Sequence, residues 1–410
     1  MGLDAKEIPA AMRDRARGVL LGQFVGDALG TTVEFSNAAA IAERYPGGLR
    51  DIEGGGPFNL LPGQVTDDGE LALALARTLA AHGWDLDARA AAYAAWRNSR
   101  PFDVGAATNA AFGDFGAEPT AAQMLARAQR ANGAENKQAN GALMRISPAA
   151  VFGAFLSPTV LAERACEDAR LSHPSKPCQA ADAALAVAIQ ALLHEATREQ
   201  AWKSARAAAA AIAGGEAVVA ALDDVAKQPV CDGPGQGWVL LALRNAFHFL
   251  LHEQDFERAL VKTVMAGGDA DTNGCIAGAL LGAACGLEGI PARWVVKVLA
   301  CRTTRGAAYQ TTDALSLADR LLERGLAESR SDETSRPAAP AAPLADRTSE
   351  AIAVAKAAGG KTSAHRTDPA RMVIKVPLTA LEAKRVLRQL LGAEPAKGQA
   401  YWVFDVEKPG

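Results

Sequence analysis

The feature that most constrains the fold is an apolar periodicity of about 3.6 residues that recurs from residue 14 to about residue 326. Strand-like alternation is nearly absent before residue 370, and short Gly- or Pro-bearing turns separate the periodic segments. Because Ala is frequent, aromatic residues make up only 5%, and Ala has the highest helix propensity, the sequence predicts closely packed helices. Helices are expected over residues 12–30, 69–82, 85–98, 121–132, 159–170, 179–197, 199–213, 215–226, 236–252, 255–264, 273–286, 291–301 and 313–326.

Composition excludes several classes of protein. The chain has 410 residues, 43 Lys and Arg, 46 Asp and Glu, and a net charge of −3, so it lacks the basic surplus typical of nucleic-acid or acidic-membrane binding. Apolar residues make up 49% and charged residues 22%, which excludes wholesale disorder. No uncharged apolar run reaches the ~18 residues that a membrane-spanning helix needs.

The composition changes near the C-terminus, which predicts three parts. Residues 1–326 form an all-α, compact multi-helix bundle in this interpretation. Residues 327–370 are rich in Pro, Ala, Ser and charge and are predicted to be a linker. Residues 371–410 are predicted to form a small β-α-β appendage, with strands in RMVIKVPL and QAYWVFDVE flanking the amphipathic helix LTALEAKRVLRQLLG.

The N-terminal residues and the cysteines indicate the cellular compartment. The first residues carry early charges and no apolar signal region, so no secretory signal is expected. The six cysteines form neither a CxxC pair nor a zinc-ligand pattern with histidine, and are interpreted as small apolar residues in a reducing cytoplasm.

Two acidic clusters stand directly before predicted helices: Thr66, Asp67 and Asp68, and Asp269, Asp271 and Thr272. Each could simply cap its helix, because Thr and Asp are favoured there. If the fold brings the clusters together, however, six oxygen donors face one cavity, which is the ligand set that Mg²⁺ prefers. Two such ions about 3.5–4 Å apart can orient a substrate and activate water. Suitable His and Cys ligands for zinc or copper are lacking in the sequence.

Five motifs occur in a characteristic order: GDALG followed by Glu34, then TDD, NGALMR, LSHP and GGDADT. With this order over residues 14–326, the chain resembles the ADP-ribosylglycohydrolase family. The resemblance implies a compact all-α fold, a binuclear magnesium centre, with Mn²⁺ as a possible substitute, and cleavage of the glycosidic bond between ADP-ribose and an acceptor.

The resemblance also implies roles for individual residues. It makes the six residues of the two acidic clusters metal ligands, and Glu34 and Asp103 the acids that exchange protons near the reacting ribose. It places five residues around the ADP-ribose: Asn140, Gly141, Met144, Arg145 and His173.

Structural alternatives remain open for several of these residues. Asp103 could cap a helix, His173 could bond to the backbone of its loop, Arg145 could be a structural ion-pair partner and Glu34 could be a surface acid.

The sequence departs from the usual family pattern at three positions. Gly69 stands where TDDT has its second threonine, Ala270 stands between the aspartates of GGDADT, and Ala106 replaces a common asparagine after Asp103. None of these changes removes a carboxylate, although they can alter the order around the ligands.

The expected function is a magnesium-dependent hydrolase that removes ADP-ribose from an ADP-ribosylated acceptor, such as a protein arginine or a small molecule. The alternative is an immunity-type protein that binds and blocks an ADP-ribosylating toxin, with or without hydrolysis. No membrane or nucleic-acid partner is expected in either case.

Overall fold

The structure is a computed structural model that describes residues 8–115, 118–303, 305–335, 352, 355–356, 361–364, 371–377, 396–397 and 401–407. The chain divides into two compact units, Met1–Ser331 and Asp332–Gly410. Within the described residues, every helix is too short or too polar to traverse a lipid bilayer.

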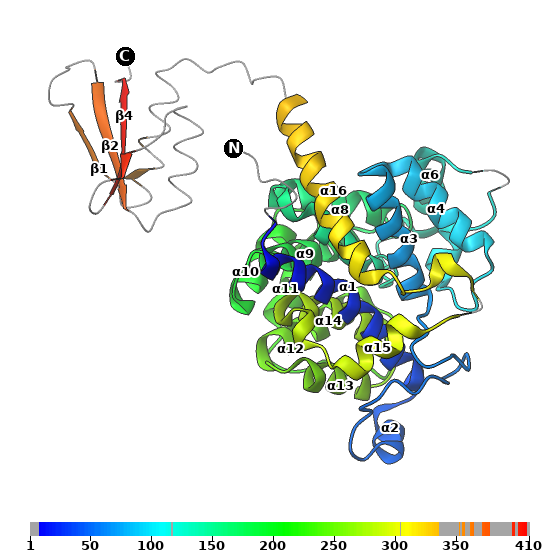
Figure 1. Ribbon diagram of the computed structural model, residues 1–410. Helices are drawn as coiled ribbons and strands as arrows, with labels where there is room; N and C mark the ends of the chain where they lie inside the picture. The colour runs from blue at the N-terminus through cyan, green and yellow to red at the C-terminus, as the bar shows by residue number, and fades with distance from the viewer. Residues whose placement is uncertain are drawn as a thin grey trace. The chain divides into compact units, whose positions relative to one another are not determined.

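The first unit is all-α, which confirms the predicted fold class (Figure 1). Its helices are α1 (Ala10–Gly30), α2 (Ala38–Arg44), α3 (Asp67–His82), α4 (Leu86–Asn98), α5 (Ala106–Phe112), α6 (Ala121–Asn132), α7 (Ser147–Phe152), α8 (Pro158–Arg170), α9 (Lys176–Leu193), α10 (Arg198–Ala210), α11 (Glu216–Asp223), α12 (Val239–His252), α13 (Phe256–Met265), α14 (Ala270–Cys285), α15 (Ala292–Ala300) and α16 (Ala314–Ser335).

The helices that sequence periodicity missed are the short ones. Helices α2, α5 and α7 have seven, seven and six residues, which is too few to establish an apolar period. The long helices lie close to their predicted ranges, and α6 occupies residues 121–132 as expected. Helix α16 differs most, because it continues to Ser335, beyond the predicted linker start at residue 327.

Helices α1 and α14 form the centre of the first unit and pack directly against each other (Figure 1). We call their contact the glycine seam; it consists of Gly18, Gly22, Gly26 and Gly30 on α1 and Gly274, Gly278 and Gly282 on α14. A Cβ added at Gly22 or Gly26 would overlap the backbone carbonyl of the facing glycine on α14. The glycines face each other in antiparallel order, from Gly18 opposite Gly282 to Gly26 opposite Gly274. The C-terminal end of α1 is therefore fixed beside the N-terminal end of α14.

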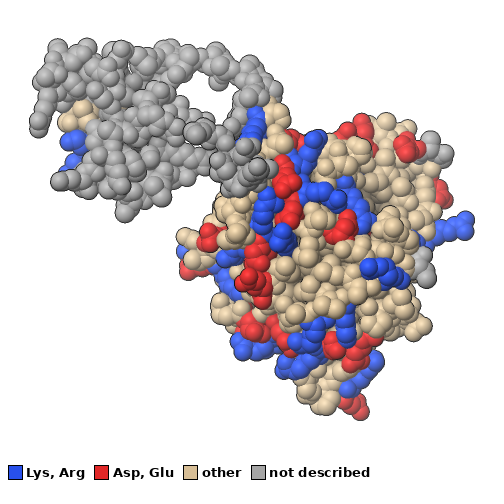
Figure 2. All heavy atoms as spheres, viewed as in Figure 1, with Lys and Arg blue, Asp and Glu red and all other residues tan. Residues whose placement is uncertain are grey.

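The surface around α16 carries charges of both signs side by side (Figure 2). Arg17 of α1, for example, pairs with Asp319 of α16 at 2.6 Å. This face therefore matches the near-neutral composition and shows no broad basic patch.

The second unit contains an antiparallel sheet in the order β1-β2-β4-β3. Its strands are β1 (Lys361–Ala364), β2 (Arg371–Pro377), β3 (Ala396–Lys397) and β4 (Tyr401–Glu407). Strands β2 and β4 match the two predicted strands and pair directly, with Ile374 opposite Phe404. The polar strand β1 lies in the predicted linker and lacks the alternation that would reveal it. The helix predicted over 378–392 lies outside the described residues.

Candidate active site

A cavity of about 260 Å³ lies where the end of α1 meets the first turns of α3 and α14. Most of the sequence-predicted site residues line it: Glu34, Asp67, Asp68, Asp103, Asn140, Gly141, Met144, His173, Asp269, Asp271 and Thr272. The cavity is also lined by residues that the sequence did not single out as a site: Phe35, Gly105, Ala107, Thr108, Ala139, Gln236 and Gly237. Thr66 and Arg145 are buried and are absent from the described lining. The structure thus brings together acidic residues from distant parts of the chain.

The first turn of α3 is held by Asp27, a buried carboxylate on α1. The backbone N–H of Thr66 donates to Asp27 at 3.1 Å, and that of Gly69 donates at 2.8 Å. The Thr66 hydroxyl donates to Asp27 Oδ1 at 3.0 Å and to Asp68 Oδ2 at 3.2 Å. Asp27 therefore satisfies the unpaired amides at the start of α3, so that Asp67 and Asp68 are left to face the cavity.

Gly69 makes this arrangement possible. A Cβ at position 69 would lie 2.7 Å from Asp27 Oδ2 and 2.6 Å from the Cβ of Val65. The departure from TDDT therefore has a physical counterpart, since the missing side chain leaves room for the Asp27 carboxylate.

The first turn of α14 is reached through a tight turn made by two glycines. Gly267 and Gly268 have φ angles of 69° and 71°, and a Cβ at Gly268 would overlap the carbonyl oxygen of Cys231. The Asp269 carboxylate accepts a hydrogen bond from Asn140 Nδ2 at 2.7 Å, and Asp271 Oδ1 accepts one from the N–H of Thr272 at 2.9 Å.

The two acidic clusters and the two predicted proton-exchanging acids form one electrostatic unit. Carboxylate oxygens of Glu34, Asp103 and Asp271 lie within 4.8 Å of one another. Burial, reinforced by Asp103 and other acids, raises the pKa of Glu34 to about 8. Burial likewise raises the pKa of Asp67 and Asp271 well above the usual range, with further contributions from neighbouring carboxylates.

This donor set fits divalent cations. Six carboxylates line the cavity, and neither Lys nor Arg is found among its described lining residues. Asp68 Oδ1 and Glu34 Oε2 are buried without a hydrogen-bond partner in the described part of the chain. Buried, unpartnered carboxylate oxygens are costly, and hard oxygen-binding cations such as Mg²⁺ or Mn²⁺ would relieve that cost.

Arg145 lies behind the part of the cavity lining that Gly141 forms, in a fully buried ion pair with Asp168 at 3.1 Å. It also donates to the carbonyl oxygen of Gly141 at 2.8 Å, which positions the wall from behind. Asp168 additionally accepts a hydrogen bond from the Tyr93 hydroxyl at 2.9 Å. The geometry therefore corresponds to the structural alternative for Arg145.

His173 is a lining residue that stays neutral. It is buried, which lowers its pKa to about 3, and its Nδ1 lies 2.8 Å from the Ser172 hydroxyl. A Cβ at Gly141 would come within 2.9 Å of the His173 ring, so glycine allows the backbone at residue 141 and the His173 ring to lie close together.

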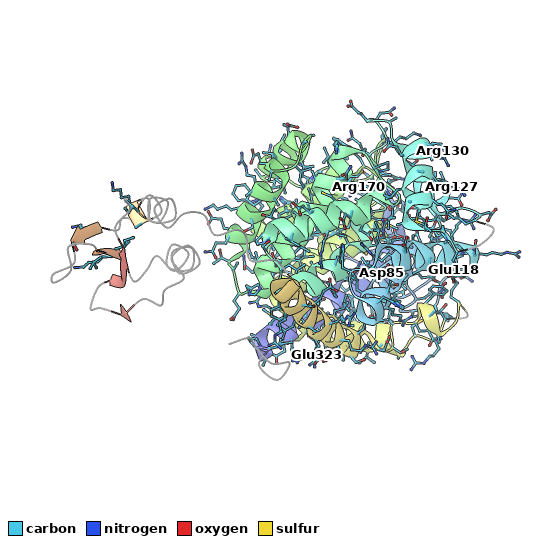
Figure 3. The ribbon with its side chains drawn as sticks, turned by 90° about the horizontal axis from the view of Figure 1, so that it is seen from above. Asp85, Glu118, Arg127, Arg130, Arg170 and Glu323 are labelled. Atoms are coloured by element: carbon cyan, nitrogen blue, oxygen red, sulfur yellow. The ribbon has the colours of Figure 1, made fainter. Side chains whose placement is uncertain are left out.

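The Asp103 side of the cavity is carried by the segment that leads into α5. Arg127 on α6 (Figure 3) donates to the carbonyl oxygens of Ala110 at 3.1 Å and Gly113 at 3.2 Å, which ties the end of α5 to α6. Asp103 is partly exposed, and burial still raises its pKa.

Comparison with known proteins assigns the family, because the profile described as ADP-ribosylglycohydrolase matches residues 8–331. The chain belongs to the ADP-ribosylglycohydrolase family. It is 34% identical over 313 residues to the ADP-ribosyl-[dinitrogen reductase] glycohydrolase of Rhodospirillum rubrum, a match that covers 75% of this chain and 98% of the relative.

Two further proteins are similar over most of their length. The ADP-ribosylarginine hydrolase Tri1 of Pseudomonas putida (strain GB-1) is 29% identical over 324 residues, covering 76% of this chain and 82% of the relative. A solved structure titled ADP-ribosylglycohydrolase-related protein complex has a TM-score of 0.63 and 29% identity, covering 77% of this chain and all of that one. The family resemblance and the enzyme class predicted from the sequence are therefore confirmed.

Asp27 and Phe35 are two residues of this ADP-ribosylglycohydrolase to which the motifs assigned no individual role. Asp27 had a detectable signal, since a carboxylate within the apolar helix sequence GVLLGQFVGDALG is costly unless it is bonded. Phe35 had none, because its exposure depends on the backbone turn that follows α1.

Proposed function

We propose that this ADP-ribosylglycohydrolase is a magnesium-dependent hydrolase that removes ADP-ribose from a protein arginine. The observation that carries the proposal is the convergence of Asp67 and Asp68 with Asp269 and Asp271 on one cavity. The names of the two curated relatives, which refer to ADP-ribosyl-[dinitrogen reductase] and ADP-ribosylarginine, support an ADP-ribosylated protein as the substrate.

Two Mg²⁺ ions, or Mn²⁺ as a substitute, would be held by the two acidic clusters. Five of the six predicted ligands line the cavity, whereas the Thr66 hydroxyl is engaged by Asp27 and Asp68. Bound cations would supply the positive charge that orients ribose hydroxyls and makes a water molecule more acidic.

The remaining groups perform proton exchange and positioning. Glu34 and Asp103 face the same cavity, so one carboxyl can protonate the departing acceptor nitrogen while the other accepts a proton from the attacking water. Positive charge develops at the ribose carbon as its bond to the acceptor nitrogen breaks, as in ordinary glycoside cleavage, and the surrounding carboxylates stabilise it until water adds. Asn140, Gly141, Met144 and His173 also line the cavity and would contact the ADP-ribose, with Arg145 supporting Gly141 from behind.

The direct test incubates the full chain with an arginine-ADP-ribosylated protein and Mg²⁺ and measures released ADP-ribose. Asp67→Asn and Asp271→Asn should each lower the rate by at least about 100-fold and remove calorimetrically detected Mg²⁺ binding. Asp319→Asn on α16 is the matched control, because it also removes one carboxylate but lies in a surface ion pair. Full activity in EDTA contradicts the proposed metal dependence.

The alternative of a protein that blocks an ADP-ribosylating toxin is supported by none of the comparisons and by no observation on the described residues. Cytoplasmic location stays a prediction.

A further inference from the structure

Phe35 adopts a backbone conformation that is unusual for an aromatic residue. Its φ angle is 60°, in the left-handed region where bulky side chains are strained. The segment is fixed there, because the Phe35 N–H donates to the Gly268 carbonyl at 2.8 Å and the Gly268 N–H donates to the Ser36 carbonyl at 2.9 Å. If position 35 had to provide only the turn, glycine would adopt this conformation without strain.

The Phe35 ring is not used for packing in the core. The residue is 57% exposed, in a chain whose aromatic content is only 5%. Nevertheless the residue lines the cavity, next to Glu34, whose carboxylate belongs to the cluster with Asp103 and Asp271. The strained turn therefore holds an apolar ring at the edge of an acidic cavity, where solvent or a ligand contacts it.

The chemistry of this edge favours a planar cation. A ligand that contacts Phe35 meets an aromatic ring beside carboxylates, without competition from Lys or Arg among the described lining residues. Cations are attracted to aromatic faces, and the guanidinium group can also stack on a ring while donating to carboxylates. Hydroxyl acceptors such as serine offer neither the charge nor the flat surface.

We propose that Phe35 is a specificity-determining residue that contacts the guanidinium of an ADP-ribosylated arginine and so favours arginine over serine as the acceptor. This inference rests on the proposed hydrolase function and specifies which part of the substrate the ring contacts. The ring acts on the acceptor, whereas the two acidic clusters and the wall at Asn140 act on the ADP-ribose.

The test compares hydrolysis of two peptides that differ only in carrying ADP-ribose on arginine or on serine. Phe35→Ala should lower kcat/KM for the arginine peptide by about 5- to 30-fold, mainly through KM, and change that for the serine peptide by less than about twofold. Phe35→Leu, which keeps apolar bulk without the aromatic face, should resemble Phe35→Ala, whereas Phe35→Trp should retain the preference. Affinities for Mg²⁺ and for free ADP-ribose, measured by calorimetry, should not change.

Two further variants separate specificity from stability. Phe35→Gly relieves the strained backbone, so it should melt at or above the wild-type temperature while losing the arginine preference. Val296→Ala is the matched control, because Val296 is 62% exposed and lies outside the cavity lining, and it should leave both peptides unaffected.

Each opposite outcome is decisive. If Phe35→Ala weakens the binding of free ADP-ribose by as large a factor as it lowers kcat/KM for the arginine peptide, the ring contacts ADP-ribose and the proposal is wrong. If Phe35→Leu keeps the wild-type preference, a cation–aromatic contact is excluded. If the wild type releases ADP-ribose from neither peptide, the proposed hydrolase function itself fails, and the role of Phe35 fails with it.

Discussion

The first turns of α3 and α14 present similar acidic residues to one cavity, but different contacts hold them in place. At the third helical position α3 has Gly69 where α14 has Thr272, and the space beside Gly69 is taken by the carboxylate of Asp27. The start of α3 is therefore capped by a carboxylate of α1. The start of α14 is instead positioned by its glycine turn and by the hydrogen bond from Asn140 to Asp269.

In α3, the acids of the first turn face the cavity because a group from another helix bonds the backbone amides. In the sequence, Asp67 and Asp68 look like ordinary acids of a first helical turn. In the structure, however, the backbone N–H groups of Thr66 and Gly69 donate to Asp27 instead. Because α1 carries Asp27 and also packs on α14 through the glycine seam, the same helix fixes both clusters relative to each other.

The largest effect is expected from a change in the glycine seam, which joins the two compared regions. Gly26→Val would drive α1 away from the Gly274 carbonyl and should lower the free energy of unfolding by more than about 3 kcal/mol in urea titration. Gly47→Ala is the control, since a Cβ there meets nothing within 4 Å. Equal stability of the two variants would show that close contact between α1 and α14 is not required.

A pH-dependent effect of Mg²⁺ tests whether the two clusters act as one charged unit. Burial raises the pKa of Glu34 to about 8 and that of Asp27 to about 7, whereas the unfolded chain releases these protons near pH 4. The unfolded state therefore binds fewer protons, so the stability of the cation-free protein should fall as the pH rises from about 4 to about 8.

Bound Mg²⁺ replaces these protons, so its stabilising effect should grow over the same range. The rise in Tm on adding Mg²⁺, measured by calorimetry, should be about 5–10 °C larger at pH 8 than at pH 5. A rise that is the same at both pH values would contradict a cluster that exchanges protons for cations.

Asp27→Asn should affect α3 more than α14. An amide at this position turns one acceptor into a donor that faces the N–H groups of Thr66 or Gly69, which disorders the first turn of α3. Mg²⁺ affinity should fall by roughly 10- to 100-fold, as measured by calorimetry. The Asp319→Asn control should keep the wild-type affinity for Mg²⁺. An unchanged Mg²⁺ affinity in Asp27→Asn would falsify the supporting role of Asp27.

The smallest effect is expected for Gly69→Ala. The added Cβ would press on Asp27 Oδ2, but the gain in helix propensity offsets part of the cost, so the net destabilisation should be about 1 kcal/mol. Chemical denaturation measures this change, and a stabilised variant would mean that Asp27 can move away freely.

The local sequence pattern was sufficient to predict the long helices and the two acidic clusters, because the periodicity of a helix and the residues of a motif lie within one segment of the chain. It was insufficient for the short helix α5 and for strand β1, which have too few residues to establish a period. The importance of Asp27 depends on α1 lying beside α3, and the exposure of Phe35 depends on its pairing with Gly268; neither relationship is local.

The glycine seam also sets the order of events during synthesis. Helix α1 leaves the ribosome near the beginning of translation, but the partner for its glycine face is encoded close to the end of the first unit. Because contacts between distant parts of a chain form late, the nascent protein carries α1 without its final neighbour for most of its elongation. An N-terminal fragment that stops before residue 269 therefore lacks Asp269 and Asp271, two of the six carboxylates that line the cavity.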